Sequence, residues 1–375
     1  MPSKTDADVI DGVLADKVAH TCTAELGGVL VGWSAWNRLG MSELLHSLSF
    51  THDQALSAAI SVINRLVEPS SEHSLLDWYH RTGLPELMDN PLWGAGDDRF
   101  YRISDRLLAN KERIEQHLRD KQMSLFNLER TVLLYDLTNT HFEGLCKDNP
   151  KAKRGKNKQK RNDCPQIVVG MVFDQHGFEL SHKVFDGNQS DAKSLVEMIG
   201  ELNASVPKGT EKPLVIMDAG VATAANLALL REHGFGYLVN DHTLDEHDYW
   251  KLYIRLTHAE AGFKSLKTDL GLRPNPHHKE DRVDGHVFIC IIAYHLLRNI
   301  LWTLEQQQDY RSWETIKRIM STHCYTTILL PTKEGVTHRI RKAGQPEECQ
   351  KEIYRALAIE WTNLPSHRTT VSQKR

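Results

Sequence analysis

Short apolar segments of β type alternate with helical segments between residues 131 and 306, and this order constrains the fold more than any other feature. Strands are predicted at 131–135, 166–174, 178–185, 213–217 and 236–239, and helices at 191–203, 223–233, 249–270 and 284–306. Three strands come first, and helices and strands then alternate. This order is typical of a mixed sheet with helices packed on it, so we predict an α/β fold.

The composition is that of a folded chain, with 40% hydrophobic and 25% charged residues. No apolar run reaches the ~18 residues that a membrane helix needs, so we expect no contact with a membrane. The N-terminus lacks a basic segment followed by an apolar one, and no signal peptide is predicted. The six cysteines contain no C-x-x-C pair, which disfavours a zinc ribbon, and as free thiols they fit a cytoplasmic protein.

Three regions are predicted along the chain. Residues 1–125 form a mostly helical domain, with helices at 53–66 and 98–121 whose apolar residues follow one face. This domain is either a helical bundle without chemistry or a domain that binds DNA ends. Residues 126–306 form the α/β core, and residues 307–375 form a helical or irregular basic region.

The net charge of -3 conceals an uneven distribution. Residues 1–125 hold 12 Lys and Arg against 18 Asp and Glu, and residues 126–250 hold 14 against 18. Residues 251–375 hold 20 against 13. A strongly basic protein is therefore excluded, but the basic C-terminal third is a weak indication of a surface for a polyanion.

A densely basic loop joins the first two predicted strands. Seven of the eleven side chains at 151–161 are cationic. Because like charges repel at this density unless a polyanion lies among them, phosphate contact is favoured over a solvated linker. The candidate phosphate ligands are Lys153, Arg154, Lys156, Lys158, Lys160 and Arg161.

Two aspartates occupy equivalent places in the predicted sheet. Asp136 and Asp218 each follow an apolar strand directly. Proteins of the α/β class place reactive groups at strand ends, beside the crevice of the sheet. One such aspartate is weak evidence, but two in one sheet favour a functional site.

The helix predicted at 249–270 supplies a third carboxylate. Tyr253, Glu260 and Lys267 recur at seven-residue intervals and so follow one line beside the apolar stripe, with Lys264 one turn after Glu260. Taken alone, Glu260 would be a surface residue in an ion pair. Together with the two aspartates, it is a candidate site residue.

Three carboxylates in one crevice stay ionised together only if cations lie among them. Hard divalent ions such as Mg²⁺ meet that need and also bind phosphate oxygens. Two such ions, roughly 3.5–4 Å apart, can activate an attacking hydroxyl and stabilise the leaving oxygen of an in-line displacement. With Lys264, Lys267 and the basic loop to hold phosphates, the pattern predicts metal-dependent phosphodiester chemistry on DNA or RNA.

Five motifs occur in order between residues 130 and 305. They are YDLTNT at 135–140, DCPQ at 163–166, FDGN at 185–188, VIMDAG at 215–220 and EAGFKSLKTDLGLRPNPHHKEDRVDGH at 260–286. This series resembles bacterial insertion-sequence DDE transposases of the IS-four type. The resemblance implies a ribonuclease-H-like core and cut-and-paste DNA transposition. It also implies a catalytic, metal-binding triad of Asp136, Asp218 and Glu260.

The resemblance further implies the cofactor and the partners. We expect two Mg²⁺ ions, for which Mn²⁺ can substitute, and a homodimer on double-stranded DNA that carries terminal inverted repeats or serves as target. The location would be the cytoplasm of a prokaryote, in association with the nucleoid. Candidate DNA ligands beside the triad are Tyr253, Lys264, Lys267 and Arg273.

Two features depart from the family pattern. The family carries a Tyr, Arg, Glu, Lys signature along the helix of the glutamate, and here the Arg position is Leu256. The interval from Asp218 to Glu260 is 42 residues, too short for the large insertion that relatives often carry there. The alternative function is therefore a shortened, catalytically inactive DNA-binding protein derived from a transposase. A minor alternative is a phosphatase of the haloacid-dehalogenase type, although Thr138 replaces its second aspartate.

Overall fold

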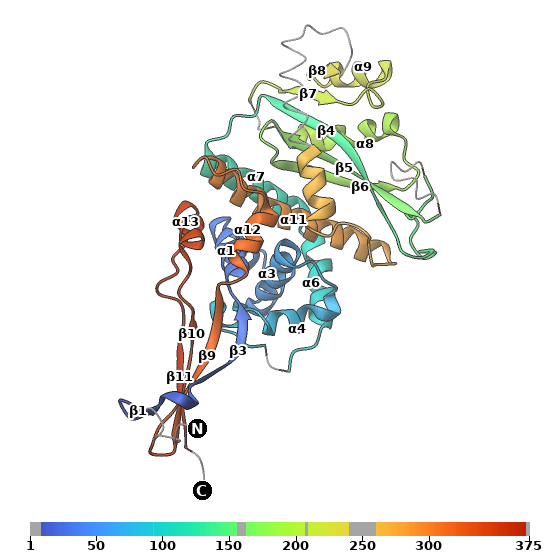
Figure 1. The fold of residues 1–375 in the computed structure, drawn as a ribbon. Coiled ribbons are helices and arrows are strands. Elements are labelled where there is room, and N and C mark those ends of the chain that lie inside the picture. Colours follow the sequence, from blue (N-terminus) through green and yellow to red (C-terminus); the bar gives the residue numbers. More distant parts are fainter. Residues whose placement is uncertain (1–8, 93, 156–162, 207–208, 240–259, 373–375) are drawn as a thin grey trace. The chain divides into compact units, whose positions relative to one another are not determined.

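The computed structural model describes residues 9–92, 94–155, 163–206, 209–239 and 260–372 (Figure 1). The chain divides into two compact units, each made of segments that are distant in sequence. Unit 1 comprises Met1–Ala35, His73–Asp97 and Ile300–Arg375, and unit 2 comprises Trp36–Glu72 and Asp98–Asn299. The domain boundaries expected near residues 125 and 306 stay predictions.

Unit 2 is built on a five-stranded sheet with the strand order β6-β5-β4-β7-β8. Strand β5 pairs antiparallel with β4 and β6, whereas β7 pairs parallel with β4 and β8. The strands are β4 Val132–His141, β5 Gln166–Asp174, β6 Glu179–Asp186, β7 Leu214–Met217 and β8 Gly236–Val239. The predicted α/β class with a mixed sheet is confirmed.

Helices cover both faces of this sheet. Helices α8 (Asp191–Ala204) and α9 (Ala224–Glu232) pack on the face to which Leu133 and Tyr135 belong. Because side chains alternate along a strand, Leu134 and Asp136 face the other side. On that side the ring of Phe173 contacts Phe263 and Tyr294, with centroids 5.3 and 5.9 Å apart. These contacts place residues 260–268 and helix α11 (Glu280–Glu305) over the second face.

The other helices of unit 2 are α2 Met41–Ser47, α3 His52–Val67, α6 Asp98–Leu108 and α7 Lys111–Phe126. The single helix expected at 98–121 is wrong, because it is interrupted at Ala109 and Asn110. The side chain of Asn110 donates a hydrogen bond of 2.9 Å to the carbonyl of Arg106. This bond satisfies a carbonyl at the end of α6, where the helix stops.

Unit 1 contains a four-stranded antiparallel sheet with the order β11-β10-β9-β3. Its strands are β3 Ala19–Glu25, β9 Cys324–Pro331, β10 Val336–Ala343 and β11 His367–Ser372. The expectation of helical or irregular structure is wrong for these segments. All six residues of β11 are exposed, so this strand lacks the apolar face that marks a strand in a sequence.

Short elements complete unit 1. They are β1 Val9–Ile10, β2 Val13–Leu14, η1 Ala15–Lys17, α4 Leu75–His80, α5 Leu84–Leu87, α12 Trp313–Met320 and α13 Glu348–Ala356. Helix α1 (Gly27–Arg38) and the 3-10 helix η2 (Glu72–Ser74) each begin in one unit and end in the other.

Among the described residues, α11 is the one helix that is long and apolar enough to cross a membrane by length and composition. Its most apolar stretch is 83% buried inside the protein. A core helix passes the same test, and the expected buried helix at 284–306 is confirmed.

Candidate active site: a carboxylate crevice

Backbone pairing sets two of the three predicted carboxylates beside each other. Tyr135 pairs with Met217 in the parallel ladder between β4 and β7, and Asp136 and Asp218 come next in the two segments. Neighbouring strands lie about 4.8 Å apart. The Oδ1 atom of Asp136 accepts a hydrogen bond of 2.7 Å from the next backbone N–H, and that of Asp218 accepts the same bond at 2.8 Å. The two aspartates therefore share one local geometry.

Asp136 lies inside its strand, so the prediction that it follows the strand's end is wrong for this residue. Strand β4 continues to His141 in its pairing with β5, whereas β7 ends at Met217. Among the described residues, no strand therefore pairs with the β7 side of β4 from Asp136 to Thr140. Asp136 and Asp218 lie where this unpaired stretch begins.

The turn after Asp218 is tied to the neighbouring helix. The buried side chain of Asn226 donates hydrogen bonds to the carbonyl of Val221 at 2.6 Å and to that of Ala192 at 2.7 Å. Val221 belongs to the turn, and Ala192 belongs to the first turn of α8. Asn226 thus fixes the segment that carries Asp218 against α8.

Glu260 lies on the exposed side of a helical segment at 260–268. Phe263 and Leu266 of this segment and Leu270 after it are buried, as the predicted apolar stripe requires. Leu252, Leu256 and Ala259 of the same stripe lie outside the described residues.

Two backbone carbonyls connect this segment to the strand that carries Asp136. The hydroxyl of Thr140 donates a hydrogen bond of 2.9 Å to the carbonyl of Leu272, which follows the helical segment. The backbone N–H of Asn275 donates one of 3.0 Å to the carbonyl of His141. The connection after Glu260's helix is therefore anchored to the far end of β4.

The three carboxylates line two hollows that share part of their lining. The first, of about 320 Å³, is lined by Asp136 and Glu260. The second, of about 760 Å³, is lined by Asp136 and Asp218. Because Asp136, Leu137 and Asn139 line both, the hollows form one carboxylate crevice. The catalytic and metal-binding roles of Asp136, Asp218 and Glu260 stay predictions.

Three cations lie in the first hollow, and all three were candidate DNA ligands. They are Lys264, Lys267 and Arg273. Lys264 is exposed, whereas the ammonium of Lys267 lies 5.5 Å from the centroid of the Phe263 ring. Partial burial lowers the pKa of Arg273, but a guanidinium stays charged at neutral pH. The crevice thus holds carboxylates beside positively charged side chains.

The described part of the basic loop is engaged in ion pairs and hydrogen bonds. Lys153 pairs with Asp186, and the guanidinium of Arg154 donates a hydrogen bond of 3.4 Å to the carbonyl of Asp163. Gly155 lines the second hollow, so the loop leaves from the rim of the carboxylate crevice. The remaining candidates lie outside the described residues: Lys156, Lys158, Lys160, Arg161 and Tyr253.

Sequence reasoning missed one carboxylate. Asp191, expected only to begin a helix, lines the second hollow together with Asp218. Its Oδ2 atom is 3.2 Å from the position that a Cβ would take at Gly220. Acidic residues are common in the first turn of any helix, so the sequence held no signal that distinguished this one.

A separate charged cluster is buried between α7, β6 and α11. The carboxylate of Glu115 lies 2.8 Å from Nδ1 of His182 and 2.7 Å from Nζ of Lys111. Glu179 contacts the same Nδ1 atom at 3.3 Å and Nε2 of His295 at 2.9 Å. Opposite charges therefore already balance this cluster internally.

The ion pairs shift the titration of two members of this cluster. Burial opposes ionisation, but hydrogen bonds from His182 and His295 hold the pKa of Glu179 well below its ordinary 4.5. Burial and Lys111 oppose protonation of His182, but Glu115 and Glu179 raise its pKa above the ordinary 6.5. The ion pairs thus favour the charged forms of both groups.

Comparison with known proteins agrees with this geometry. Residues 127–296, which contain all three carboxylates, match the family described as the transposase DDE domain. This match supports a transposase; the IS-four type and the bacterial origin stay predictions. No curated protein matches the chain.

Solved structures show distant similarity. One is the piggyBac transposase synaptic complex with hairpin DNA, at 10% identity and a TM-score of 0.39, with 72% of this chain and 70% of that chain covered. Another is the Mos1 transposase paired-end complex with left transposon end, at 11% identity and a TM-score of 0.23. That alignment covers 71% of this chain and 79% of the other.

Proposed function

We propose that the protein is a DNA transposase that cleaves and joins DNA strands in the carboxylate crevice. One observation carries this proposal. Carboxylates from a strand, from the end of its parallel neighbour and from a helix line hollows that share Asp136. They do so within the segment that matches a transposase DDE domain.

The ligands of the crevice fit hard divalent ions. Asp136, Asp218 and Glu260 offer only carboxylate oxygens, which Mg²⁺ prefers and which Mn²⁺ accepts. Asp218 and Glu260 are exposed, which leaves room for phosphate oxygens. Two ions bound there would supply Lewis acidity and an activated hydroxyl for phosphodiester cleavage.

The cations of the crevice bind the substrate in this proposal. Lys264, Lys267 and Arg273 neutralise phosphates of the strand that enters beside Glu260. The substrate is double-stranded DNA, either with the terminal inverted repeats of the element or as target, and the protein acts on it as a homodimer. The proposed setting is the cytoplasm of a prokaryote.

Isosteric replacement of each carboxylate tests the proposal. Asp136→Asn, Asp218→Asn and Glu260→Gln should each abolish cleavage and strand transfer on DNA bearing the element's terminal repeats, in Mg²⁺ or Mn²⁺. Binding of the same DNA, measured by fluorescence anisotropy, should persist because no phosphate ligand is removed. Asp269→Asn, at the end of the same helical segment, is the matched control and should cleave normally. Near-normal cleavage by any triad variant would show that the assignment is wrong.

The alternatives predict different outcomes in the same assays. Sequence-specific binding by the unmodified protein with no cleavage in either ion would support the inactive DNA-binding protein. Rapid turnover of a small phosphate ester would support the phosphatase. Its second aspartate position holds Thr138, which is 2% exposed and carries no charge.

A further inference from the structure

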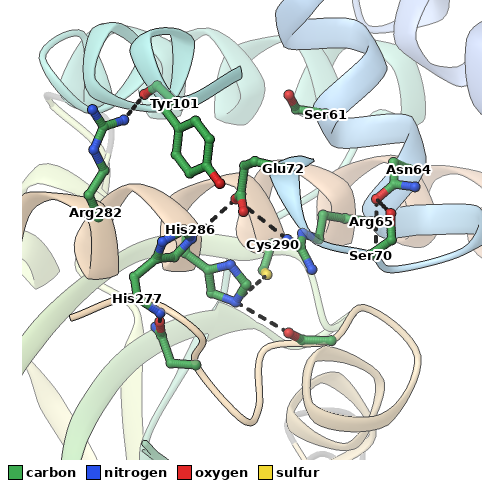
Figure 2. A network of polar contacts seen from close by, with 12 residues as sticks. Ser61, Asn64, Arg65, Ser70, Glu72, Tyr101, His277, Arg282, His286 and Cys290 are labelled. Atoms are coloured by element: carbon green, nitrogen blue, oxygen red, sulfur yellow. Dashed lines mark hydrogen bonds and ion pairs between the residues drawn. The ribbon is translucent and has the colours of Figure 1, made fainter. Parts of the chain in front are cut away.

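A second group of metal-ligating side chains lies in unit 2 and shares no residue with the lining of the carboxylate crevice (Figure 2). Glu72 begins η2, His277 lies in the connection after residues 260–268, and His286 lies on α11. One potential ligand atom from each lies within 4.8 Å of the other two. Glu72 therefore meets two histidines that lie about 200 residues later in the chain.

The hydrogen bond of His286 fixes which of its nitrogens can bind a metal. Its Nε2 atom lies 3.2 Å from the carbonyl of Gly271, which only accepts hydrogen bonds. Nε2 therefore carries the proton, and Nδ1 carries a lone pair. Donation to a backbone carbonyl is the usual way in which a metal-binding histidine is oriented.

The lone pair of His286 lacks a hydrogen-bond partner among the described residues. Nδ1 is buried, in a side chain that belongs to a residue only 1% exposed. Most buried polar atoms have a partner, and one without it needs an explanation such as a bound ion. An ion at this point would bind Nδ1 of His286, the atom that has no hydrogen-bond partner among the described residues.

Glu72 and His277 are already spaced as metal ligands. Nε2 of His277 lies 3.1 Å from Oε1 of Glu72. Zinc bonds of 2.0–2.2 Å in a tetrahedron separate neighbouring ligand atoms by about 3.3–3.5 Å. These two side chains would need to move by only a few tenths of an ångström to share an ion.

The environment of this point favours the metal-binding forms of Glu72 and His286. Burial opposes the ionisation of Glu72, but the hydrogen bond from His277 and the charges of His277 and Arg65 lower its pKa to about 2. Burial, with Arg65 and His277 nearby, lowers the pKa of His286 well below 6.5. Glu72 is thus an anion and His286 a neutral imidazole. Arg65, 3.6 Å from Glu72, will weaken the binding of a cation without displacing a ligand.

We propose that Glu72, His277 and His286 bind one zinc ion. Two imidazoles and one carboxylate suit zinc, whereas the all-carboxylate crevice suits magnesium. The ion would tie the start of η2 and helix α11 to the connection at 271–279, which also carries Arg273. It would thereby hold the segment that follows the helix of Glu260.

Zinc stoichiometry in the full-length chain tests the proposal. Protein carrying Asp136→Asn and Asp218→Asn, which weakens metal binding in the carboxylate crevice, is equilibrated with Zn²⁺, freed of excess ion and analysed by mass spectrometry of the elements. We expect one zinc per chain. Adding His277→Ala or Glu72→Gln should reduce this to near zero.

The neighbouring histidine provides a matched control. Nδ1 of His278 lies 3.3 Å from Sγ of Cys146, so this side chain points to a different partner. His278→Ala should keep one zinc per chain, and Zn²⁺ should raise the Tm of this variant but not that of His277→Ala. Circular dichroism verifies that each variant is folded.

Two results would overturn the proposal. The first is a folded parent protein that retains no zinc. The second is a folded His277→Ala variant that retains as much zinc as the parent. Neither result bears on the carboxylate crevice, whose own variants are tested by cleavage.

Discussion

Gly262→Ala should impair DNA cleavage without altering any charged residue. Gly262 lies two residues after Glu260, on the side of the helical segment that packs against the sheet. A Cβ at this position would lie 2.7 Å from the hydroxyl oxygen of Tyr294 and 3.1 Å from the ring of Phe173. Ordinary contacts begin at 3.4 Å, so the helix must move outward by roughly 0.7 Å.

The obstacle cannot easily move away. The hydroxyl of Tyr294 donates a hydrogen bond of 2.6 Å to the carbonyl of Gly177, and Tyr294 is 3% exposed. Overpacking of this kind costs about 1–3 kcal/mol of folding free energy. Because a misplacement of about 1 Å at a reacting centre can cost about 100-fold in rate, we expect cleavage to fall by about 10- to 100-fold.

The assay compares cleavage rate in Mg²⁺ with the Tm of the same protein. Gly200→Ala is the matched control, because Gly200 is an exposed glycine within α8 and a Cβ there meets nothing within 4 Å. It should leave cleavage unchanged and stabilise the fold by about 0.5–1 kcal/mol. Adding Tyr294→Phe to Gly262→Ala removes the closest atom and should restore part of the rate. If Gly262→Ala cleaved at the normal rate, the close packing of this helix would not position Glu260.

Three further predictions concern charge and burial. The cluster of Glu179 and His182 should stabilise the fold most between pH 4.5 and 6.5. Because the pKa of Glu179 is lowered in the folded protein, its contribution to stability is lost as the pH falls below 4.5. Because the pKa of His182 is raised, its contribution is lost as the pH rises above 6.5. In Glu179→Gln, the urea midpoint should no longer fall on the acid side, whereas the fall above pH 6.5 should persist in part because Glu115 still faces His182. An unchanged profile would contradict this account. Lys264→Ala should reduce the slope of log K for DNA binding against log salt concentration by about 0.9. Lys153→Ala should reduce it less, because the ammonium of Lys153 is paired with Asp186. Equal slopes for the two variants would refute this distinction. Asn226→Ala should lower the free energy of unfolding in urea by about 1–3 kcal/mol, because it leaves two carbonyls without their hydrogen-bond donor. A variant as stable as the parent would show that these two bonds do not fix the turn after Asp218.

The sheet of unit 2 could be predicted because its strands are buried. All nine residues of β5 are buried, and a continuous apolar run between turn residues is a strong strand signal. Asp136 and Asp218 follow such runs, so their equivalent places next to the paired residues Tyr135 and Met217 were also readable. The extension of β4 beyond Asp136 was not, because polar residues such as Asn139 follow it.

The sheet of unit 1 was missed in part because two of its strands, β10 and β11, are mostly polar. Strand β11 is exposed throughout, and β10 contains His338, Arg339, Arg341 and Lys342. Strand β3 pairs with β9, which lies about 300 residues later in the chain, so no local pattern joins them. Pairing at this sequence distance depends on the folded units and not on neighbouring residues.

The cluster of Glu72, His277 and His286 was unreadable for the same reason. Glu72 and His277 are 205 residues apart, and neither lies in a metal-binding spacing with the other. The neighbouring histidines point to different partners, because His277 faces Glu72 and His278 faces Cys146.

The segments that carry the three carboxylates contribute unequally to the stability of the fold, and this has an evolutionary consequence. The parallel ladder between β4 and β7 sets Asp136 and Asp218, so any copy that folds inherits their positions. Glu260 is exposed on a separate helical segment and adds little to the buried core. Selection for the fold alone therefore keeps the backbone of positions 136 and 218 side by side, whatever their side chains are, but makes no such demand on position 260. Under the proposed function, a copy that lost Glu260 would keep its core and lose its cleavage activity.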